Sequence, residues 1–191
     1  MTKRKKVKIE SYKKVFDGAV FEIYRAKGVF PSGKTGEFEY AKRAPYVGVF
    51  AFDKNKKLLL TNEYRPKLGK VIWRIPIGSI EENETPKNAA QRELREETNF
   101  RAGKMRLFMK NTRSETFVYN AYLYVANDLK VDPLSFDDGE DIVIIPTPLK
   151  KAYEMAVEGG ILSDFISLGI IRLYSQIQKK GFENFFKKNG A

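Results

Sequence analysis

The chain has 191 residues, and its 35 lysines and arginines outnumber its 24 aspartates and glutamates to give a formal net charge of +11. It contains no cysteine and no histidine, which excludes disulfides, thiolate nucleophiles, zinc sites built on these residues and imidazole acid–base catalysis. This length suits one domain with a short extension. Because nothing approaches a run of about eighteen apolar residues and the basic start lacks a following apolar segment, we expect a cytoplasmic protein with no membrane span.

The N-terminal region alternates apolar and polar residues in short runs over residues 7–44. Turn signals at Asp17-Gly18 and at Pro31-Ser32-Gly33-Lys34 divide it, so we expect hairpin-connected strands. So short a strand-rich segment has few positions for a core of its own. We therefore treat residues 1–44 as a β extension that precedes a domain of residues 45–191.

The rest of the chain alternates between strand and helix patterns. Residues 46–52 and 57–62 are expected to form a pair of strands around the turn at 53–56, and residues 71–76 a further strand. Later strands are expected at 105–111, 116–125 and 142–146, with Phe117, Tyr119, Ala121, Leu123 and Val125 on one face. Residues 150–157 and 163–179 have the spacing of amphipathic helices. This order indicates a mixed sheet packed between helices.

A charged helix is expected over residues 86–98. Thr85 can cap its start, Pro86 suits the first helical position, and Asn99 is a plausible left-handed terminator. Glu93, Glu96 and Glu97 then project from one face at positions i, i+3 and i+4. Each like-charge pair at this spacing costs roughly 0.2–0.5 kcal/mol in an isolated helix.

A divalent cation would offset that repulsion, because Mg²⁺ and Mn²⁺ take carboxylate oxygens together with water and substrate phosphates. Neighbouring arginines could offset part of it. The alternative reading of these glutamates is a solvated, charge-rich helix face without a metal.

The wider pattern around this helix resembles the signature of the Nudix hydrolases, which cleave a nucleoside diphosphate linked to a further group. The matching positions are Gly78, Glu84, Arg92, Glu93, Leu94, Glu96, Glu97 and Phe100. One position departs from the family pattern, since Asn99 stands where glycine is usual. Asparagine tolerates the same backbone conformation.

The resemblance extends over most of the chain, because EYRPKLGKVIWRIPIGSIEENETP is similar to the same stretch of the ADP-ribose pyrophosphatase branch. Segments on both sides, VFDGAVFEIYRAKGVFPSGKTGEFEYAKRAPYVGVFAFD and GEDIVIIPTPLKKAYEMAVEGGILSD, are similar to that branch as well. Two features differ. Arg74 occupies a position that is often acidic there, and residues 111–115 lack the proline-bearing loop of many ADP-ribose hydrolases.

The resemblance implies an α/β/α sandwich and a homodimer whose N-terminal strands reach the partner subunit. It also implies that Glu93 and Glu97 are principal metal ligands, that Glu96 assists, and that the Ile77 carbonyl contributes an oxygen. Arg92 would orient the glutamates. Glu84 is expected to support the loop through hydrogen bonds or an ion pair.

Substrate and acid–base groups are expected outside the helix. Arg65 is the first candidate for anchoring the substrate and Arg43 the second, although either could be an ordinary surface ion pair. Glu140, in an acidic segment at 137–141, matches the family's loop glutamate and is the expected general base; the alternative is a solvated acidic turn. Glu115 resembles another acidic position near the site, with no role assigned.

These observations predict Mg²⁺-dependent hydrolysis of ADP-ribose to AMP and ribose 5-phosphate. The alternatives within enzymes are a GDP-mannose-type nucleotide sugar or a dinucleoside polyphosphate as substrate. A polyanion-binding or RNA-binding module on the same fold is the alternative outside enzymes. Because the sequence has no nucleic-acid-binding motif, we expect nucleic acid to bind only weakly and without sequence preference.

Overall fold

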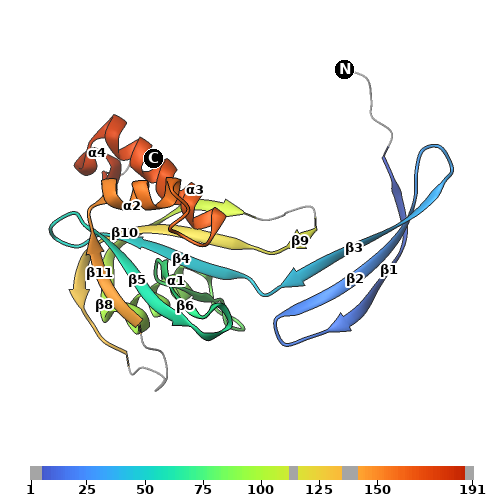
Figure 1. The fold of residues 1–191 in the computed structure, drawn as a ribbon, viewed down its shortest axis with the longest axis horizontal. Coiled ribbons are helices and arrows are strands. Elements are labelled where there is room, and N and C mark those ends of the chain that lie inside the picture. The colour runs from blue at the N-terminus through green and yellow to red at the C-terminus, as the bar shows by residue number, and fades with distance from the viewer. Residues whose placement is uncertain (1–5, 112–115, 135–141, 188–191) are drawn as a thin grey trace. The chain divides into compact units, whose positions relative to one another are not determined.

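The computed structural model describes residues 6–111, 116–134 and 142–187 (Figure 1). Its contacts divide the chain into two compact units. The first contains the described residues of 1–45 and 111–121, and the second contains those of 46–110 and 122–191.

The first unit is a four-stranded sheet in the order β1-β2-β3-β9. Its strands are β1 (Lys8–Asp17), β2 (Phe21–Val29), β3 (Thr35–Arg43) and the short β9 (Phe117–Val118). The first three run antiparallel in the predicted hairpins, and β9 adds parallel to β3 through Ala41↔Phe117 and Lys42↔Val118. Bulges interrupt β1 between Ile9 and Ser11 and between Lys14 and Phe16.

The second unit is built on two sheets, with strand orders β7-β4-β10-β8 and β11-β5-β6. The strands are β4 (Tyr46–Ala51), β5 (Leu58–Arg65), β6 (Lys70–Arg74), β7 (Ile77–Ser79), β8 (Phe100–Asn111), β10 (Ala121–Val131) and β11 (Ile142–Thr147). The helices are the 3-10 turn η1 (Pro66–Leu68), α1 (Pro86–Thr98), α2 (Leu149–Val157), α3 (Asp164–Lys180) and α4 (Phe182–Phe186). The bounds of α3 lie within one residue of the helix expected at 163–179.

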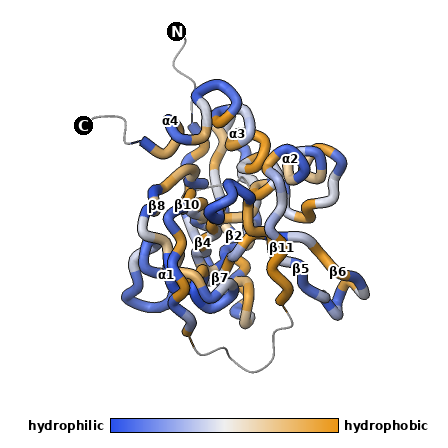
Figure 2. The backbone as a smooth tube through the Cα atoms, turned by 90° about the vertical axis from the view of Figure 1, so that its left-hand side faces the viewer, coloured by the Kyte–Doolittle hydropathy of each residue, from blue (hydrophilic) through white to orange (hydrophobic). Residues whose placement is uncertain are grey.

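Two apolar clusters cover opposite faces of these strands. Val47, Val49 and Ala51 of β4 pack with Leu94 of α1, whereas Phe50 and its neighbours pack with α2, α3 and α4. Alternate residues of one strand therefore feed different layers, as the two-residue period of a strand requires. In Figure 2, much of β11 is coloured as hydrophobic. The expected α/β/α sandwich with a mixed α/β fold is confirmed.

The strands around residues 53–56 do not form the expected pair. β4 is bonded to β7 and β10, and β5 to β6 and β11; the two are joined by one isolated bridge, Phe52↔Leu58. Both strands bury consecutive side chains, from Val47 to Ala51 in β4 and from Leu58 to Thr61 in β5. A strand buried on both faces lies inside a sheet, and each of these two takes its neighbours from elsewhere in the chain.

The single strand expected at 116–125 is also wrong. This stretch is divided between β9, which belongs to the first unit, and β10, which belongs to the second unit from Tyr122 onward. Phe117 lies against Phe21 with ring centroids 6.4 Å apart, while Leu123 and Val125 are fully buried in the core of the second unit. An alternating pattern can continue across such a break, so the pattern did not reveal it.

Candidate functional site

The helix that carries the glutamates begins and ends at the residues that the sequence indicated. Thr85 Oγ1 accepts a hydrogen bond from the Asn88 N–H at 3.3 Å, and Pro86 occupies the first turn. Asn99 adopts φ 60°, in the left-handed region, and its N–H donates to the Arg95 carbonyl at 2.8 Å. These two caps fix the register of Glu93, Glu96 and Glu97 on α1.

Gly78 of β7 passes directly over one of these carboxylates. It lies opposite Val47 in the antiparallel pair of β4 and β7. A Cβ atom at this position would come within 2.0 Å of Glu93 Cδ and Oε1. The absence of a side chain at Gly78 is therefore what allows the backbone to approach the Glu93 carboxylate so closely.

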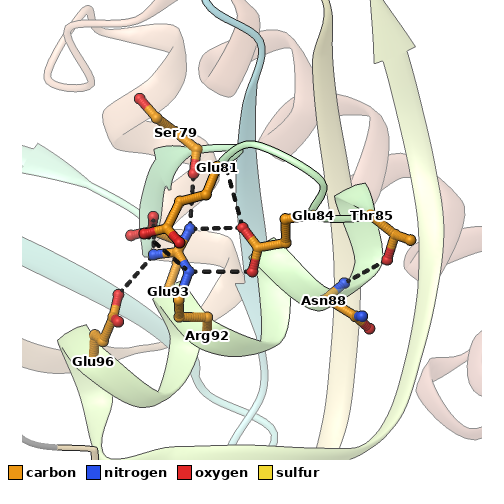
Figure 3. Close-up of polar contacts among 8 residues, drawn as sticks. All are labelled: Ser79, Glu81, Glu84, Thr85, Asn88, Arg92, Glu93 and Glu96. Carbon is orange, nitrogen blue, oxygen red and sulfur yellow. Dashed lines mark hydrogen bonds and ion pairs between the residues drawn. The ribbon is translucent and has the colours of Figure 1, made fainter.

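The Arg92 guanidinium forms hydrogen bonds with three carboxylates, and that of Glu81 lies 3.8 Å from its Nε (Figure 3). Nη1 donates to Glu93 Oε1 at 2.8 Å and to Glu96 Oε2 at 2.9 Å. Nε and Nη2 donate to the two oxygens of Glu84 at 3.2 and 3.0 Å, and Nη2 also donates to the Ser79 carbonyl at 2.9 Å. These interactions tie α1 to the loop that leads into it, and the cluster raises the pKa of Arg92.

Glu84 makes the contacts expected of a loop-supporting residue. Besides Arg92, it accepts the Glu81 N–H at 3.2 Å, which closes the turn before α1. Burial by itself raises the pKa of its carboxyl, but the hydrogen bonds from Arg92 and Glu81 outweigh burial, and the pKa lies below its ordinary value. Glu84 is thus held as a carboxylate.

Glu93 and Glu97 are the buried members of the trio, each with 9% of its surface exposed. Burial raises the pKa of Glu93, although the neighbouring Arg92 opposes the shift. Glu97 Oε1 accepts the Ile77 N–H at 3.3 Å, so the residue expected to offer a carbonyl to a metal is fixed to the helix through its own amide. Glu96 is more open, with 34% of its side chain exposed.

The donor set fits a hard divalent cation. Two buried carboxylates, a third partly exposed carboxylate and a nearby backbone carbonyl are the oxygen ligands that Mg²⁺ and Mn²⁺ prefer. Within the described ranges no three His, Cys, Asp or Glu side chains are already arranged so that they could hold a metal ion. Arg92 Nη1 occupies the position between Glu93 and Glu96, and supplies the positive charge there.

Two of the other predicted site residues end strands. Arg65, at the end of β5, pairs with Glu63 through Nη2 and Oε2 at 2.9 Å. Arg43 ends β3 in the first unit, opposite Phe21. Glu140 and Glu115 fall outside the described residues.

Sequence reasoning missed the importance of Glu63 and of the Ser79 carbonyl. Glu63 lies on β5 with 8% of its surface exposed, and it pairs with both Arg65 and Arg74. The expected strand stopped at residue 62; continuing its alternation would have placed Glu63 and Arg65 on one face. No local sequence signal marks Ser79, because its role comes from a backbone oxygen.

The part of the chain from residue 42 to residue 151 matches the model of the NUDIX domain. This range contains the Gly78 loop, α1 and the whole Arg92 cluster. The chain therefore belongs to the Nudix family.

Three curated proteins share most of their length with this chain. One, from Bacillus methanolicus, is named a methanol dehydrogenase activator and is 29% identical over 86% of this chain and 90% of its own. ADP-ribose pyrophosphatases of Bacillus subtilis (strain 168) and Mycobacterium tuberculosis (strain ATCC 25618 / H37Rv) are 28% and 24% identical, over 74% and 83% of this chain and 78% of each relative.

A solved structure described as an ADP compounds hydrolase superimposes with a TM-score of 0.81 at 20% identity, over 95% of this chain and 99% of the other. It confirms the fold. Together with the sequence relatives, it confirms the expected resemblance to the ADP-ribose pyrophosphatase-like branch and the class of a Nudix pyrophosphohydrolase. None of the helices in the described residues has the length and apolar character that a bilayer crossing demands.

Proposed function

We propose that the protein hydrolyses ADP-ribose to AMP and ribose 5-phosphate in a reaction that depends on Mg²⁺. The observation that carries this proposal is the arrangement of Glu93, Glu96 and Glu97 beneath the Gly78 loop, ordered by Arg92. The resemblance to two ADP-ribose pyrophosphatases supports the substrate.

Glu93, Glu97 and the Ile77 carbonyl would hold the metal, with Glu96 assisting, and Mn²⁺ could take the place of Mg²⁺. Such an ion, when bound, neutralises diphosphate charge and lowers the pKa of a coordinated water. Arg92 orients Glu93 and Glu96 through its hydrogen bonds, and its charge opposes the rise that burial causes in the pKa of Glu93. Glu84 holds the other side of Arg92 and so fixes its position.

The remaining steps fall to residues off the helix. Arg65 and Arg43 would bind the anionic substrate, and Glu115 would lie near it. Glu140 would remove the proton from the attacking water, since a chain without histidine must use another base. Water adds to phosphorus, and the bond from that phosphorus to the bridging oxygen breaks.

The first unit is proposed to complete a homodimer. Tyr12, Tyr24 and Tyr40 stack across β1, β2 and β3 with ring centroids 4.8 to 5.4 Å apart. Ile9 and Tyr12 remain 53% and 57% exposed. Apolar side chains gathered on one sheet face favour burial against another protein surface. A cytoplasmic location stays a prediction.

A substrate panel with Mg²⁺ tests the proposed reaction. ADP-ribose, GDP-mannose and diadenosine triphosphate are each incubated with the enzyme, and the released nucleoside monophosphate is quantified by chromatography. ADP-ribose should give the highest kcat/KM. Glu97→Gln should abolish turnover, whereas Glu158→Gln, which removes an exposed carboxylate at the end of α2, should not.

Two outcomes would overturn the proposal. Preferred hydrolysis of GDP-mannose or diadenosine triphosphate would replace the substrate and keep the reaction type. If no compound is hydrolysed, and RNA binds tightly with sequence preference at physiological salt, the protein is a polyanion-binding module instead.

A further inference from the structure

Two arginines of the second unit share one carboxylate on the hairpin of β5 and β6. Glu63 Oε2 lies 2.9 Å from Arg65 Nη2 and 3.2 Å from Arg74 Nη1. The Glu63 side chain is 10% exposed, whereas those of Arg65 and Arg74 are 39% and 23% exposed. The carboxylate is thus covered, while both guanidinium groups still reach solvent.

Strand alternation places this trio on the sheet face that α1 covers. Leu59 of β5 belongs to the apolar cluster of α1, so Thr61, Glu63 and Arg65 follow it on the same face. Arg74 lies opposite Thr61 in the antiparallel pair of β5 and β6 and therefore shares that face. The next residue, Ile75, is fully buried in the other cluster, as alternation demands.

Arg74 also lies close to the glutamate site along the chain. Arg74 is three positions before Ile77, and three residues of chain span at most about 11 Å between Cα atoms. The Ile77 N–H is bonded to Glu97. The Arg74 side chain lies on the sheet face that α1 covers. It can therefore reach one group of a ligand while a neighbouring group of that ligand is bound at α1.

The charges of the trio do not balance. Two guanidinium groups face a single carboxylate: Arg74 Nη1 donates one hydrogen bond to Glu63 Oε2, and Arg65 Nη2 forms an ion pair with the same oxygen. A guanidinium has five N–H donors in a planar fork that matches phosphate oxygens. The trio therefore keeps an excess positive charge and donors suited to an anion.

The geometry points to an anion subsite formed by Arg65 and Arg74, positioned by Glu63, which takes a phosphate beyond the diphosphate of the substrate. This inference rests on the proposed function and extends it: ADP-ribose stays the preferred substrate, but of two diadenosine compounds that differ only by one phosphate, the one with three phosphates should be hydrolysed with the higher kcat/KM. Arg74 is the specificity-determining residue, and Glu63 limits how strongly the subsite attracts the extra phosphate.

Diadenosine triphosphate and diadenosine diphosphate form the matched pair for the test, since they differ by one phosphate. The readout is the ratio of their kcat/KM values with Mg²⁺. The wild-type ratio should exceed one, and Arg74→Gln should lower it roughly tenfold or more through the loss of a charge-assisted hydrogen bond. Lys70→Gln, which removes an exposed charge from the same strand, should leave it unchanged.

Glu63→Gln separates this role from a structural one. Glu63→Gln removes the negative charge that faces both arginines, so the ratio of the two kcat/KM values should rise. If Glu63 and Arg74 only support the local structure, Glu63→Gln and Arg74→Gln should instead move this ratio in the same direction. A wild-type ratio at or below one, an unchanged ratio in Arg74→Gln, or a fall in both variants would overturn the subsite.

Failure of the proposed function gives a different result. If the wild-type protein hydrolyses neither diadenosine compound and does not hydrolyse ADP-ribose, the proposed reaction is wrong. The subsite is then decided by calorimetry with inorganic triphosphate and diphosphate. Tighter binding of triphosphate that is lost in Arg74→Gln supports it, and equal binding refutes it.

Discussion

Replacing Gly78 with alanine should remove activity while leaving the fold in place. The new Cβ would lie 2.0 Å from Glu93 Cδ, and real Cβ atoms essentially never approach another heavy atom closer than 3.0 Å. The atom that must move is the end of a flexible side chain, so the Glu93 carboxylate should give way by about 1 Å rather than the backbone.

The loss of activity should be larger than the loss of stability, because moving the Glu93 carboxylate disturbs the site more than the apolar core. Glu93 would lose its 2.8 Å contact with Arg92 Nη1, and a charge-assisted hydrogen bond of this kind stabilises by roughly 1.5–3 kcal/mol. Because this pair keeps some solvent exposure, we expect a loss of about 1–2 kcal/mol, or roughly 2–8 °C in Tm for a chain of this size. A misplacement of about 1 Å at a reacting centre can cost roughly 10²-fold in rate.

The assay combines kcat at saturating Mg²⁺, the Mg²⁺ concentration for half-maximal rate, and urea unfolding. Gly160→Ala is the control, since its nearest atom, the Met155 carbonyl oxygen, is 3.2 Å away. In a Glu93→Gln background, Gly78→Ala should cause little additional loss, because both changes act on one carboxylate. Wild-type kcat in Gly78→Ala, or full additivity of the two losses, would refute the reasoning.

Glu97→Gln should remove most activity and leave the unfolding free energy close to that of the wild type, because the amide oxygen can still accept the Ile77 N–H while like-charge repulsion falls; near-normal kcat would contradict the metal assignment. Glu140→Gln should lower kcat by roughly 10²–10⁴-fold with KM and Mg²⁺ dependence little changed, and the Asn variants of Asp137, Asp138 and Asp141 are the controls for a base misassigned within that segment. Deletion of residues 1–44 should give a monomer, an aggregate or an inactive protein in light scattering and activity assays, and a soluble, fully active monomer would refute the dimer proposal.

Interactions between residues close in the sequence determined the bounds of α1 and the face on which its glutamates lie. A capping threonine, a proline in the first turn and an asparagine that accepts positive φ act within a few residues of themselves, so the bounds of α1 and the shared face of Glu93, Glu96 and Glu97 could be predicted from the sequence. The hairpins of the first unit followed in the same way from their turns and their alternating pattern. The resemblance to the family signature added Gly78, Glu84 and Arg92 to the site, which no local pattern indicated.

Contacts between distant segments were decided only by the tertiary structure. Arg92 meets Glu84 and the Ser79 carbonyl because β4 and β7 pair and direct the Gly78 loop over α1. Glu63 meets Arg74 across eleven residues because the β5–β6 register puts them on one face. Periodicity states which faces of a strand are buried, but it does not choose the neighbouring strand. That choice depends on packing among all the elements, which separated β4 from β5 and divided β9 from β10.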